Sequence, residues 1–420
     1  MCRAKTDLVR TMCLGSLLLV ASACSGGSAQ PPAAAPLHED AIVVEGHAHV
    51  TNRVFHEGID PWTPQATGLW DYARAKAGGV DVVIENVHAD DSYNNYNVTV
   101  KQVVRLIEVF YRVLDANRDK MELALTAADV RRIVASGKMA VILAIESGFD
   151  MEGDLDVLRL FHRLGVRLVQ FANHNTTNAY VDAGLGEQRW NGINDHGRKL
   201  IAEMNRLGMI IDISHASDAA QLQIIEASRS PVTASHHGLR AFCDHPRNLS
   251  DGVLKALTAK GGLMGMHSSA SFLSQRYYDW SRARQQTSEP PSLAIRSPDR
   301  DYGQYLADLD ATMTGRWRGN YSRPWREMAP PDAPLPSVED WVAQVGHVIN
   351  LVGDQHVGIG LDMNQGGSNL RDFDATSFPR LTEAMLAAGY AEGRVRKILG
   401  ENWLSLIDRV QAAAGVRQTE

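Results

Sequence analysis

The sequence predicts an α/β fold: a (β/α)8 TIM barrel with a long aromatic-rich insertion after the seventh strand. Three observations predict it. Eight short apolar runs recur along the chain, amphipathic helical patterns separate most of them, and polar residues of metal-binding type follow most of the runs. Near-continuous apolar runs are typical of parallel strands buried on both faces, and eight alternating units predict a closed barrel. An open doubly wound sheet is the alternative, because sequence indicates strand number better than closure.

The predicted strands each span four to seven residues of mainly branched apolar side chains. They are Ala41–Glu45, Val80–Glu85, Met139–Ile145, Leu168–Ala172, Met209–Ile213, Val232–Ser235, Leu263–Met266 and Val357–Leu361. The predicted helices have apolar residues at helical spacing. They are Val100–Asn117, Leu155–Leu164, Asp195–Leu207, Asp218–Ser228, Ser250–Ala259, Val338–Val352, Thr382–Ala388 and Ala391–Val410.

One stretch, residues 272–336, interrupts this alternation with few regular patterns, several prolines and many aromatic residues. It follows the seventh strand, so it leaves the barrel at the carboxyl-terminal mouth. A long excursion at that place is often a lid or a binding loop. A packing arm or dimer arm is the other interpretation.

Composition bounds the class of protein. The chain has 420 residues, 44% of them hydrophobic and 22% charged, which is a normal globular balance. The formal net charge is −7 and no run of Lys and Arg occurs, so we expect no nucleic-acid partner.

The amino terminus resembles a bacterial export signal. Basic residues precede a short apolar run, which ends in Val20-Ala21-Ser22-Ala23-Cys24. This resembles a lipobox, in which the signal is cut before a cysteine that becomes lipidated, here Cys24. Residues 1–24 are therefore predicted to be a lipoprotein signal, 25–37 a flexible tether and 38–420 a single barrel domain. Secretion after cleavage at an Ala-x-Ala site is the alternative. Both interpretations export the protein, and the first anchors it in the bacterial envelope or periplasm by lipid.

The remaining cysteines allow no internal disulfide. Cys2 and Cys13 fall inside the predicted signal and Cys24 is the predicted anchor, which leaves only Cys243 in the barrel.

Candidate ligands stand at or just beyond the ends of the predicted strands. They are His47, His49, Glu146, His174, His215, His236 and Asp362. A barrel brings the carboxyl ends of its strands to one mouth, where catalytic groups belong. In an extended chain, His47 and His49 face the same side and can reach one metal. Imidazole and carboxylate groups are the ligands of catalytic zinc, and their number suggests two ions with Glu146 as the bridge.

Longer motifs carry a resemblance to a known family. They are Glu203 to Ser217 (EMNRLGMIIDISHAS), Ser235-His236 followed by Cys243, Arg247 and Asn248, and Gly358-Ile359-Gly360-Leu361-Asp362. On these motifs the chain resembles the membrane (renal-type) dipeptidases, peptidase family M19. The resemblance runs from about Ile42 to the last helix.

The resemblance assigns roles residue by residue. His47 and His49 would bind one zinc, Glu146 would bridge two, and His215 and His236 would bind the second. His174 would contact the substrate carbonyl, Arg247 the substrate carboxylate, and Asp362 would move the proton. The implied reaction is hydrolysis of dipeptides by a metal-bridging hydroxide, including dipeptides with a carboxyl-terminal D-residue. Relatives are usually dimers, so a homodimer is implied as well.

The chain departs from the family pattern at three places. The first strand carries His47-Ala48-His49, where the family has His-x-Asp, so one negative charge is lost. Glu45 stands where Asp is usual. Asp362 is followed by Met363-Asn364-Gln365-Gly366 in place of Phe-Asp-Gly.

Two other functions compete with a dipeptidase. One is another amidohydrolase-type metal hydrolase, acting on a lactone, a cyclic amide or a β-lactam. Such enzymes commonly bridge their metals with a carboxylated lysine on the fourth strand, and no lysine lies in residues 168–174. The other is a metal-binding lipoprotein that has lost catalysis, which His49 and the altered loop after Asp362 would favour.

Overall fold

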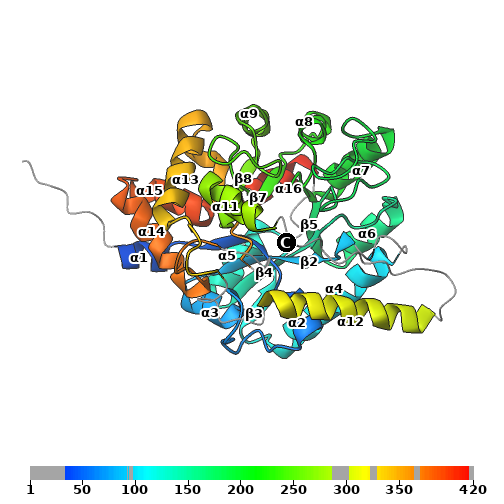
Figure 1. The fold of residues 1–420 in the computed structure, drawn as a ribbon, viewed down its shortest axis with the longest axis horizontal. Coiled ribbons are helices and arrows are strands. Elements are labelled where there is room, and N and C mark those ends of the chain that lie inside the picture. Colours follow the sequence, from blue (N-terminus) through cyan, green and yellow to red (C-terminus); the bar gives the residue numbers. More distant parts are fainter. Residues whose placement is uncertain are drawn as a thin grey trace, which may run out of the picture. The chain divides into compact units, whose positions relative to one another are not determined.

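Eight parallel strands form a nearly closed barrel in the computed structural model, which describes residues 34–91, 93, 98–285, 302–321, 329–363 and 369–415 (Figure 1). In sheet order the strands are β1 (Val44–Ala48), β2 (Val82–His88), β4 (Met139–Glu146), β5 (Val166–Gln170), β6 (Ile210–Asp212), β7 (Thr233–His237), β8 (Leu263–Met266) and β9 (Val357–Ile359). The predicted barrel is therefore confirmed. A ninth strand, β3 (Met121–Leu123), was not predicted and pairs with the start of β4.

The last strand returns to the first. The backbone amide of Leu361, just beyond β9, donates to Glu45 Oε1 of β1 at 2.8 Å. At Gly46 the barrel wall has no room for a side chain, because an added Cβ would lie 2.3 Å from the Trp403 ring and 2.5 Å from the Ile359 carbonyl oxygen. The indole of Trp403 itself donates to that carbonyl at 2.8 Å. This close approach is what brings the two ends of the sheet together.

Helices follow most of the strands. They are α1 (Ala34–Asp40), α2 (Val50–Glu57), α3 (Tyr72–Ala77), α4 (Thr99–Ala116), α5 (Ala127–Ala135), α6 (Leu155–Arg163), α7 (Asp195–Leu207), α8 (Asp218–Ala227), α9 (Asp251–Ala259), α13 (Val338–Val352), α14 (Phe378–Ala387), α15 (Glu392–Arg396) and α16 (Asn402–Ala413). Side chains cap several of their amino termini, as Ser217 does for α8 and Ser250 for α9. The predicted helix Ala391–Val410 is interrupted by a π-helical turn at Lys397–Glu401.

The insertion is more regular than the sequence predicts. It contains α10 (Ala270–Leu273), α11 (Gln275–Gln285) and α12 (Tyr302–Tyr321). Helix α12 lies beside α2 (Figure 1), and its Asp310 pairs with Arg105 of α4 at 2.6 Å. The expectation of few regular elements was wrong here, because this segment has helical residues without a clear apolar stripe. A role as lid or dimer arm stays a prediction.

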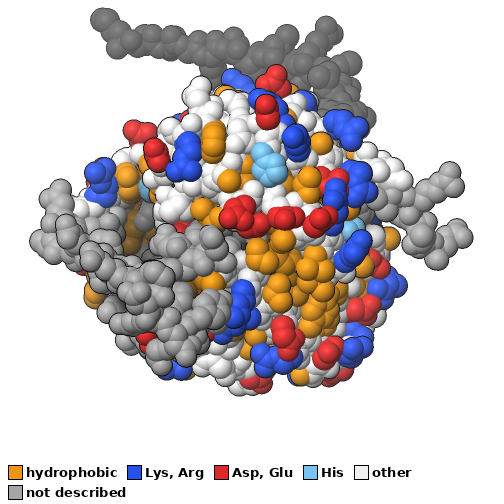
Figure 2. Space-filling view, turned by 90° about the vertical axis from the view of Figure 1, so that its right-hand side faces the viewer, with side chains coloured by type: hydrophobic (Ala, Val, Ile, Leu, Met, Phe, Trp, Pro, Cys, Tyr) orange, Lys and Arg blue, Asp and Glu red, His pale blue; other side chains and the backbone are white. Residues whose placement is uncertain are grey.

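Two features concern the outside of the molecule. On the face shown in Figure 2, acidic and basic side chains are interspersed around a group of apolar side chains.

In the part of the chain that the structure describes, no helix has both the length and the apolar character to cross a membrane. The predicted signal, Cys24 and the tether as far as residue 33 lie outside the described residues. Residues 34–37, predicted as the end of a flexible tether, instead begin helix α1, in which Leu37 is buried.

Candidate metal centre

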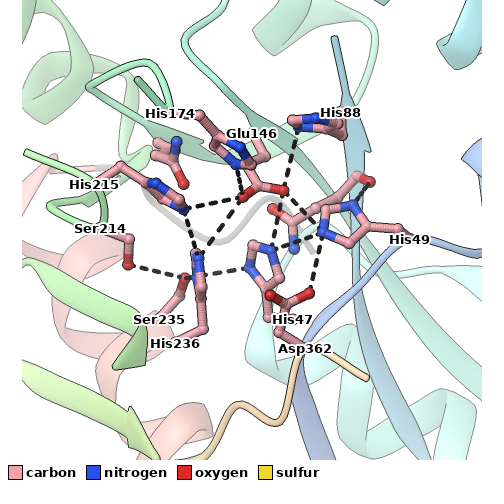
Figure 3. Close-up of polar contacts among 12 residues, drawn as sticks. His47, His49, His88, Glu146, His174, Ser214, His215, Ser235, His236 and Asp362 are labelled. Atoms are coloured by element: carbon pink, nitrogen blue, oxygen red, sulfur yellow. Dashed lines mark hydrogen bonds and ion pairs between the residues drawn. The ribbon is translucent and has the colours of Figure 1, made fainter. Parts of the chain in front are cut away.

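The carboxyl ends of the strands bring all seven candidate ligands to one mouth of the barrel (Figure 3). His47 lies within β1, and His49 comes directly after it. Glu146 is the last residue of β4. His236 lies within β7, so that strand is longer than predicted. His174, His215 and Asp362 stand in the turns beyond β5, β6 and β9.

Glu146 lies at the centre of these residues, and its two carboxylate oxygens face different groups. Oxygen Oε2 lies 2.8 Å from His49 Nε2 and 3.3 Å from His47 Nε2. Oxygen Oε1 lies 2.5 Å from His174 Nε2, 3.4 Å from His215 Nε2 and 3.7 Å from His236 Nε2. The two oxygens therefore face different imidazoles, while the rings of His47 and His236 lie side by side, with centroids 3.8 Å apart.

Within each group, two imidazole nitrogens face one another. His47 Nε2 and His49 Nε2 are 3.0 Å apart, and His215 Nε2 and His236 Nε2 are 3.1 Å apart. Ligands at zinc–nitrogen distances of about 2.0–2.1 Å and tetrahedral angles are about 3.3 Å from each other. The residues present thus fit a metal centre. Three groups have ligand atoms within 4.8 Å of one another: His47, Glu146 and His236; His47, His49 and Asp362; and His88, Glu146 and His174.

Hydrogen bonds on the far side of the rings leave the Nε2 lone pairs free for a metal. Ser235 Oγ donates to the Asp212 carboxylate and lies 2.8 Å from His236 Nδ1 and 3.3 Å from His47 Nδ1. Because its proton goes to Asp212, this hydroxyl accepts from both rings. The Nδ1 of His49 donates to the Asn86 carbonyl oxygen at 2.9 Å. Each ring is therefore protonated at Nδ1, as ligands that bind through Nε2 must be. Asp212 thus fixes the orientation of the His47 and His236 rings through the Ser235 hydroxyl.

The electrostatics agree with this assignment. Burial would raise the pKa of Glu146, but the surrounding imidazoles, His174 first, hold it well below its usual range. Burial lowers the pKa of His215 and of His236 well below the usual value, and the positive charge of Arg247 adds to the effect. The centre therefore presents an ionised carboxylate and neutral imidazoles on the side of His215 and His236, which is the state that binds a metal.

Asp362 lies at the edge of the centre in a left-handed backbone conformation, with φ at 51°. Its Oδ1 is 3.4 Å from His49 Nε2 and its Oδ2 is 3.3 Å from His267 Nε2. The backbone amide of Ser269 donates to His267 Nδ1 at 2.8 Å, so the proton of a neutral His267 sits on Nε2, the nitrogen that lies 3.3 Å from Asp362 Oδ2. Burial would raise the pKa of Asp362, but the neighbouring imidazoles of His267 and His49 lower it.

Arg247 is a buried cation, 4% exposed, beside the second group of imidazoles. Its Nη2 donates to the His236 carbonyl oxygen at 3.2 Å, and its Nη1 lies 3.2 Å from the His237 ring. Among the described residues, no carboxylate forms an ion pair with it, and its Nε has no hydrogen-bond partner. Burial lowers the pKa of Arg247 to about 10, which still leaves it charged at neutral pH. A buried, unpaired guanidinium is suited to an anionic group of a ligand.

Two histidines at this mouth were not assigned a role from the sequence. His88 ends β2, with Nδ1 3.5 Å from Glu146 Oε2, and His267 follows β8 and faces Asp362. Their position directly at strand ends was the available signal. A single histidine at a strand end, without a partner two residues away, does not indicate a ligand by itself.

Almost the whole chain matches the model of one protein family. The model of the membrane dipeptidases, peptidase family M19, matches residues 32–420. The chain belongs to this family. The resemblance seen in the sequence is thereby confirmed, and with it the enzyme class: an M19 metallo-dipeptidase, a hydrolase that acts on peptide bonds.

Curated relatives and solved structures agree with this assignment. Dipeptidase tcpJ of Claviceps purpurea is 28% identical over 347 residues, which cover 81% of this chain and 68% of that protein. The probable dipeptidase PvdM of Pseudomonas aeruginosa superimposes with a TM-score of 0.72 at 21% identity, over 90% of this chain and 98% of that one. A metallo peptidase of Rhodobacter sphaeroides, liganded with a phosphinate mimic of the dipeptide L-Ala-D-Ala, has a TM-score of 0.66 at 23% identity over 88% of this chain and all of that one. At these identities the structures support the fold.

Proposed function

We propose that this M19 enzyme hydrolyses dipeptides with the help of two zinc ions, and that it accepts a D-residue at the carboxyl-terminal position. The observation that carries the proposal is the Glu146 carboxylate, held between two pairs of facing imidazole nitrogens 3.0 and 3.1 Å apart. His47, His49 and Glu146 would hold one ion, and His215, His236 and Glu146 the other. When bound, such ions polarise a carbonyl group and make water a better nucleophile.

The chain's own groups would perform the remaining steps. His174, whose pKa is raised by the Glu146 carboxylate against the effect of burial, would donate Nε2–H to the developing oxyanion of the scissile carbonyl. Asp362 would accept the proton of the attacking water on its carboxylate and deliver it to the leaving amine. His267 would keep that carboxylate oriented through Oδ2.

Substrate length would be set by Arg247. Its unpaired guanidinium offers a planar fork to the free carboxylate of a short peptide. Because Arg247 donates to the backbone of His236, a proposed metal ligand, the anchored carboxylate would lie close to the reacting carbonyl. The chirality of the carboxyl-terminal residue is supported by similarity alone, since a relative of the same fold binds a mimic of L-Ala-D-Ala.

The test is release of free amino acids from matched L,L- and L,D-dipeptides. Protein stripped of metal and reloaded with zinc should hydrolyse both sets, and the Asp362→Asn variant should lose most of the rate while still binding metal. The matched dipeptide amides, which lack the carboxylate, should be poor substrates. Two bound ions without hydrolysis of any dipeptide would contradict the proposal.

We also propose that the mature protein is exported and anchored by lipid at Cys24. The support is the amino-terminal sequence, with its basic start, apolar run and Ala23-Cys24 junction. Mass spectrometry of the mature amino terminus tests it: a diacylated Cys24 is expected, and an unmodified amino terminus would contradict it. A homodimer remains a prediction.

A further inference from the structure

His88 lies opposite the central carboxylate of the metal centre. It is the last residue of β2, and in the parallel ladder with β4 its Cα is paired with that of Glu146. The residue is 5% exposed, and its Nδ1 is buried without a hydrogen-bond partner. That nitrogen lies 3.5 Å from Glu146 Oε2, and Figure 3 shows the ring beside the carboxylate.

The oxygen that His88 faces is the one that also faces His47 and His49. The three imidazole nitrogens lie 2.8, 3.3 and 3.5 Å from Glu146 Oε2, each within the range that separates two ligands of one ion. The ligand atoms of His88, Glu146 and His174 also lie within 4.8 Å of one another. A buried polar atom without a partner destabilises the fold. An ion bound beside Oε2 would satisfy Nδ1 of His88.

We propose that His88 is a further metal ligand, through Nδ1, of the ion held by His47, His49 and Glu146. The inference rests on the proposed binuclear centre and goes beyond it. That ion would have three imidazole nitrogens and one carboxylate oxygen, which favours zinc over magnesium or calcium. Zinc accepts a fifth ligand, so a place for water remains. With one imidazole more than its neighbour, this half of the centre should be the one that fills first.

A weaker role must be separated from ligation. His88 could act only as a hydrogen-bond donor, with Nδ1–H directed to Glu146 Oε2. Two substitutions distinguish the roles. His88→Phe keeps a ring but removes both nitrogens. His88→Asn places an amide close to the Nδ1 position, so that it keeps a donor there but gives a poor zinc ligand.

The experiment counts metal ions, so its readout is independent of hydrolysis. Full-length wild type and variants are stripped, reloaded with zinc or cobalt, separated from free metal and analysed for bound ions per chain. Wild type should hold two ions. Both His88→Phe and His88→Asn should hold one, with the affinity for the lost ion reduced more than about 100-fold, beyond the effect of losing an outer-shell partner. The cobalt absorption of the remaining ion should be that of an ion held by His215, His236 and Glu146. A control, His267→Phe, removes another buried imidazole at the same mouth and should keep two ions.

Each other outcome overturns the inference. Two ions with an unchanged cobalt spectrum in both variants would exclude ligation by His88. Loss of an ion in His88→Phe but not in His88→Asn would show the hydrogen-bond role instead. A second measurement needs no variant: anomalous diffraction from the zinc-loaded wild type should place an ion about 2.0–2.1 Å from His88 Nδ1. Fewer than two ions in the wild type would contradict both the binuclear centre and ligation by His88. If the wild type binds two ions but hydrolyses no dipeptide, the proposed function fails while the metal counts still test ligation by His88.

Discussion

His267 Nε2 lies 3.3 Å from Asp362 Oδ2, and the Ser269 amide fixes the ring proton on that nitrogen. The imidazole therefore lies beside the carboxylate that we propose moves the proton, and we propose that it orients this carboxylate. This relationship is absent from the sequence motifs, because the two residues are nearly a hundred positions apart and neither indicates the other.

Removing this donor should slow the reaction without removing metal. We expect His267→Leu to lower kcat by roughly 10–100-fold, as the loss of an outer-shell partner usually does, with little change in KM. His267→Gln, which keeps a donor near the Nε2 position, should recover most of the rate. Steady-state kinetics and metal analysis check this. Equal rates in wild type and His267→Leu, or loss of an ion in that variant, would contradict the proposed role.

The hydroxyl of Ser235 should determine how well the histidines bind metal. Ser235→Ala removes the acceptor that keeps the protons of His47 and His236 on Nδ1. We expect zinc affinity to fall by about 10–100-fold. Ser235→Thr, which keeps the hydroxyl, is the matched control. Competition with a chelator measures the affinity, and an unchanged affinity in Ser235→Ala would show that the tautomers are fixed in another way.

Arg247 should control substrate binding more than the chemical step. Loss of a charge-assisted hydrogen bond costs about 1.5–3 kcal/mol, so Arg247→Leu should raise KM by roughly 10–100-fold. Arg247→Lys keeps the charge but not the planar fork and should recover only part of the affinity. Wild type should prefer a dipeptide to its amide, and Arg247→Leu should not. Retention of that preference in the variant would place the carboxylate elsewhere.

The stability of the metal-free protein should fall as the pH is lowered through the usual pKa of histidine. Burial lowers the pKa of His56 and His245 to about 4, and His215, His236 and His237 also titrate below 6.5 in the folded state. The unfolded chain therefore binds more protons below pH 6.5, and unfolding becomes easier. His49, His174 and Glu45 have raised pKa values, that of Glu45 being about 8 because of burial, and they act in the opposite direction, but they are fewer. Urea unfolding with a chelator at pH 7.5 and 5.5 tests this, and equal or greater stability at pH 5.5 would contradict it.

Closure of the barrel should depend on the missing side chain at Gly46. An added Cβ would meet the Trp403 ring at 2.3 Å and the Ile359 carbonyl oxygen at 2.5 Å, so Gly46→Ala should destabilise the fold by about 1–3 kcal/mol or more. At Gly393, in α15, an added Cβ meets nothing within 4 Å, so Gly393→Ala should be neutral or slightly stabilising. Denaturant unfolding compares the two variants, and equal stabilities would contradict the packing described.

The sequence predicts the barrel because its strands are buried on both faces and therefore form continuous apolar runs. The ends of the strands are harder to predict. β1 and β7 extend through His47 and His236, because polar ligands replace apolar residues where a strand reaches the mouth. The three-residue strand β3 is too short for a pattern, and α12 has no distinct apolar stripe.

The residues of the centre can be predicted from the sequence where they belong to a motif or lie at the end of a predicted strand. His47 and His49 lie together at the end of one strand, Glu146 follows a predicted strand, and His215 belongs to a longer motif. His88 and His267 are single histidines, and only the register of β2 on β4 and the turn after β8 show what they face. The role of Asp212 likewise depends on the Ser235 hydroxyl, a contact made in space between β6 and β7.

The central claim is that Glu146 bridges two metal ions, and anomalous diffraction at the zinc edge tests it most directly. We predict two peaks about 3.5–4 Å apart, one on each carboxylate oxygen of Glu146, with His47 and His49 at one and His215 and His236 at the other. A single peak, or two peaks of which only one lies within bonding distance of Glu146, would contradict it.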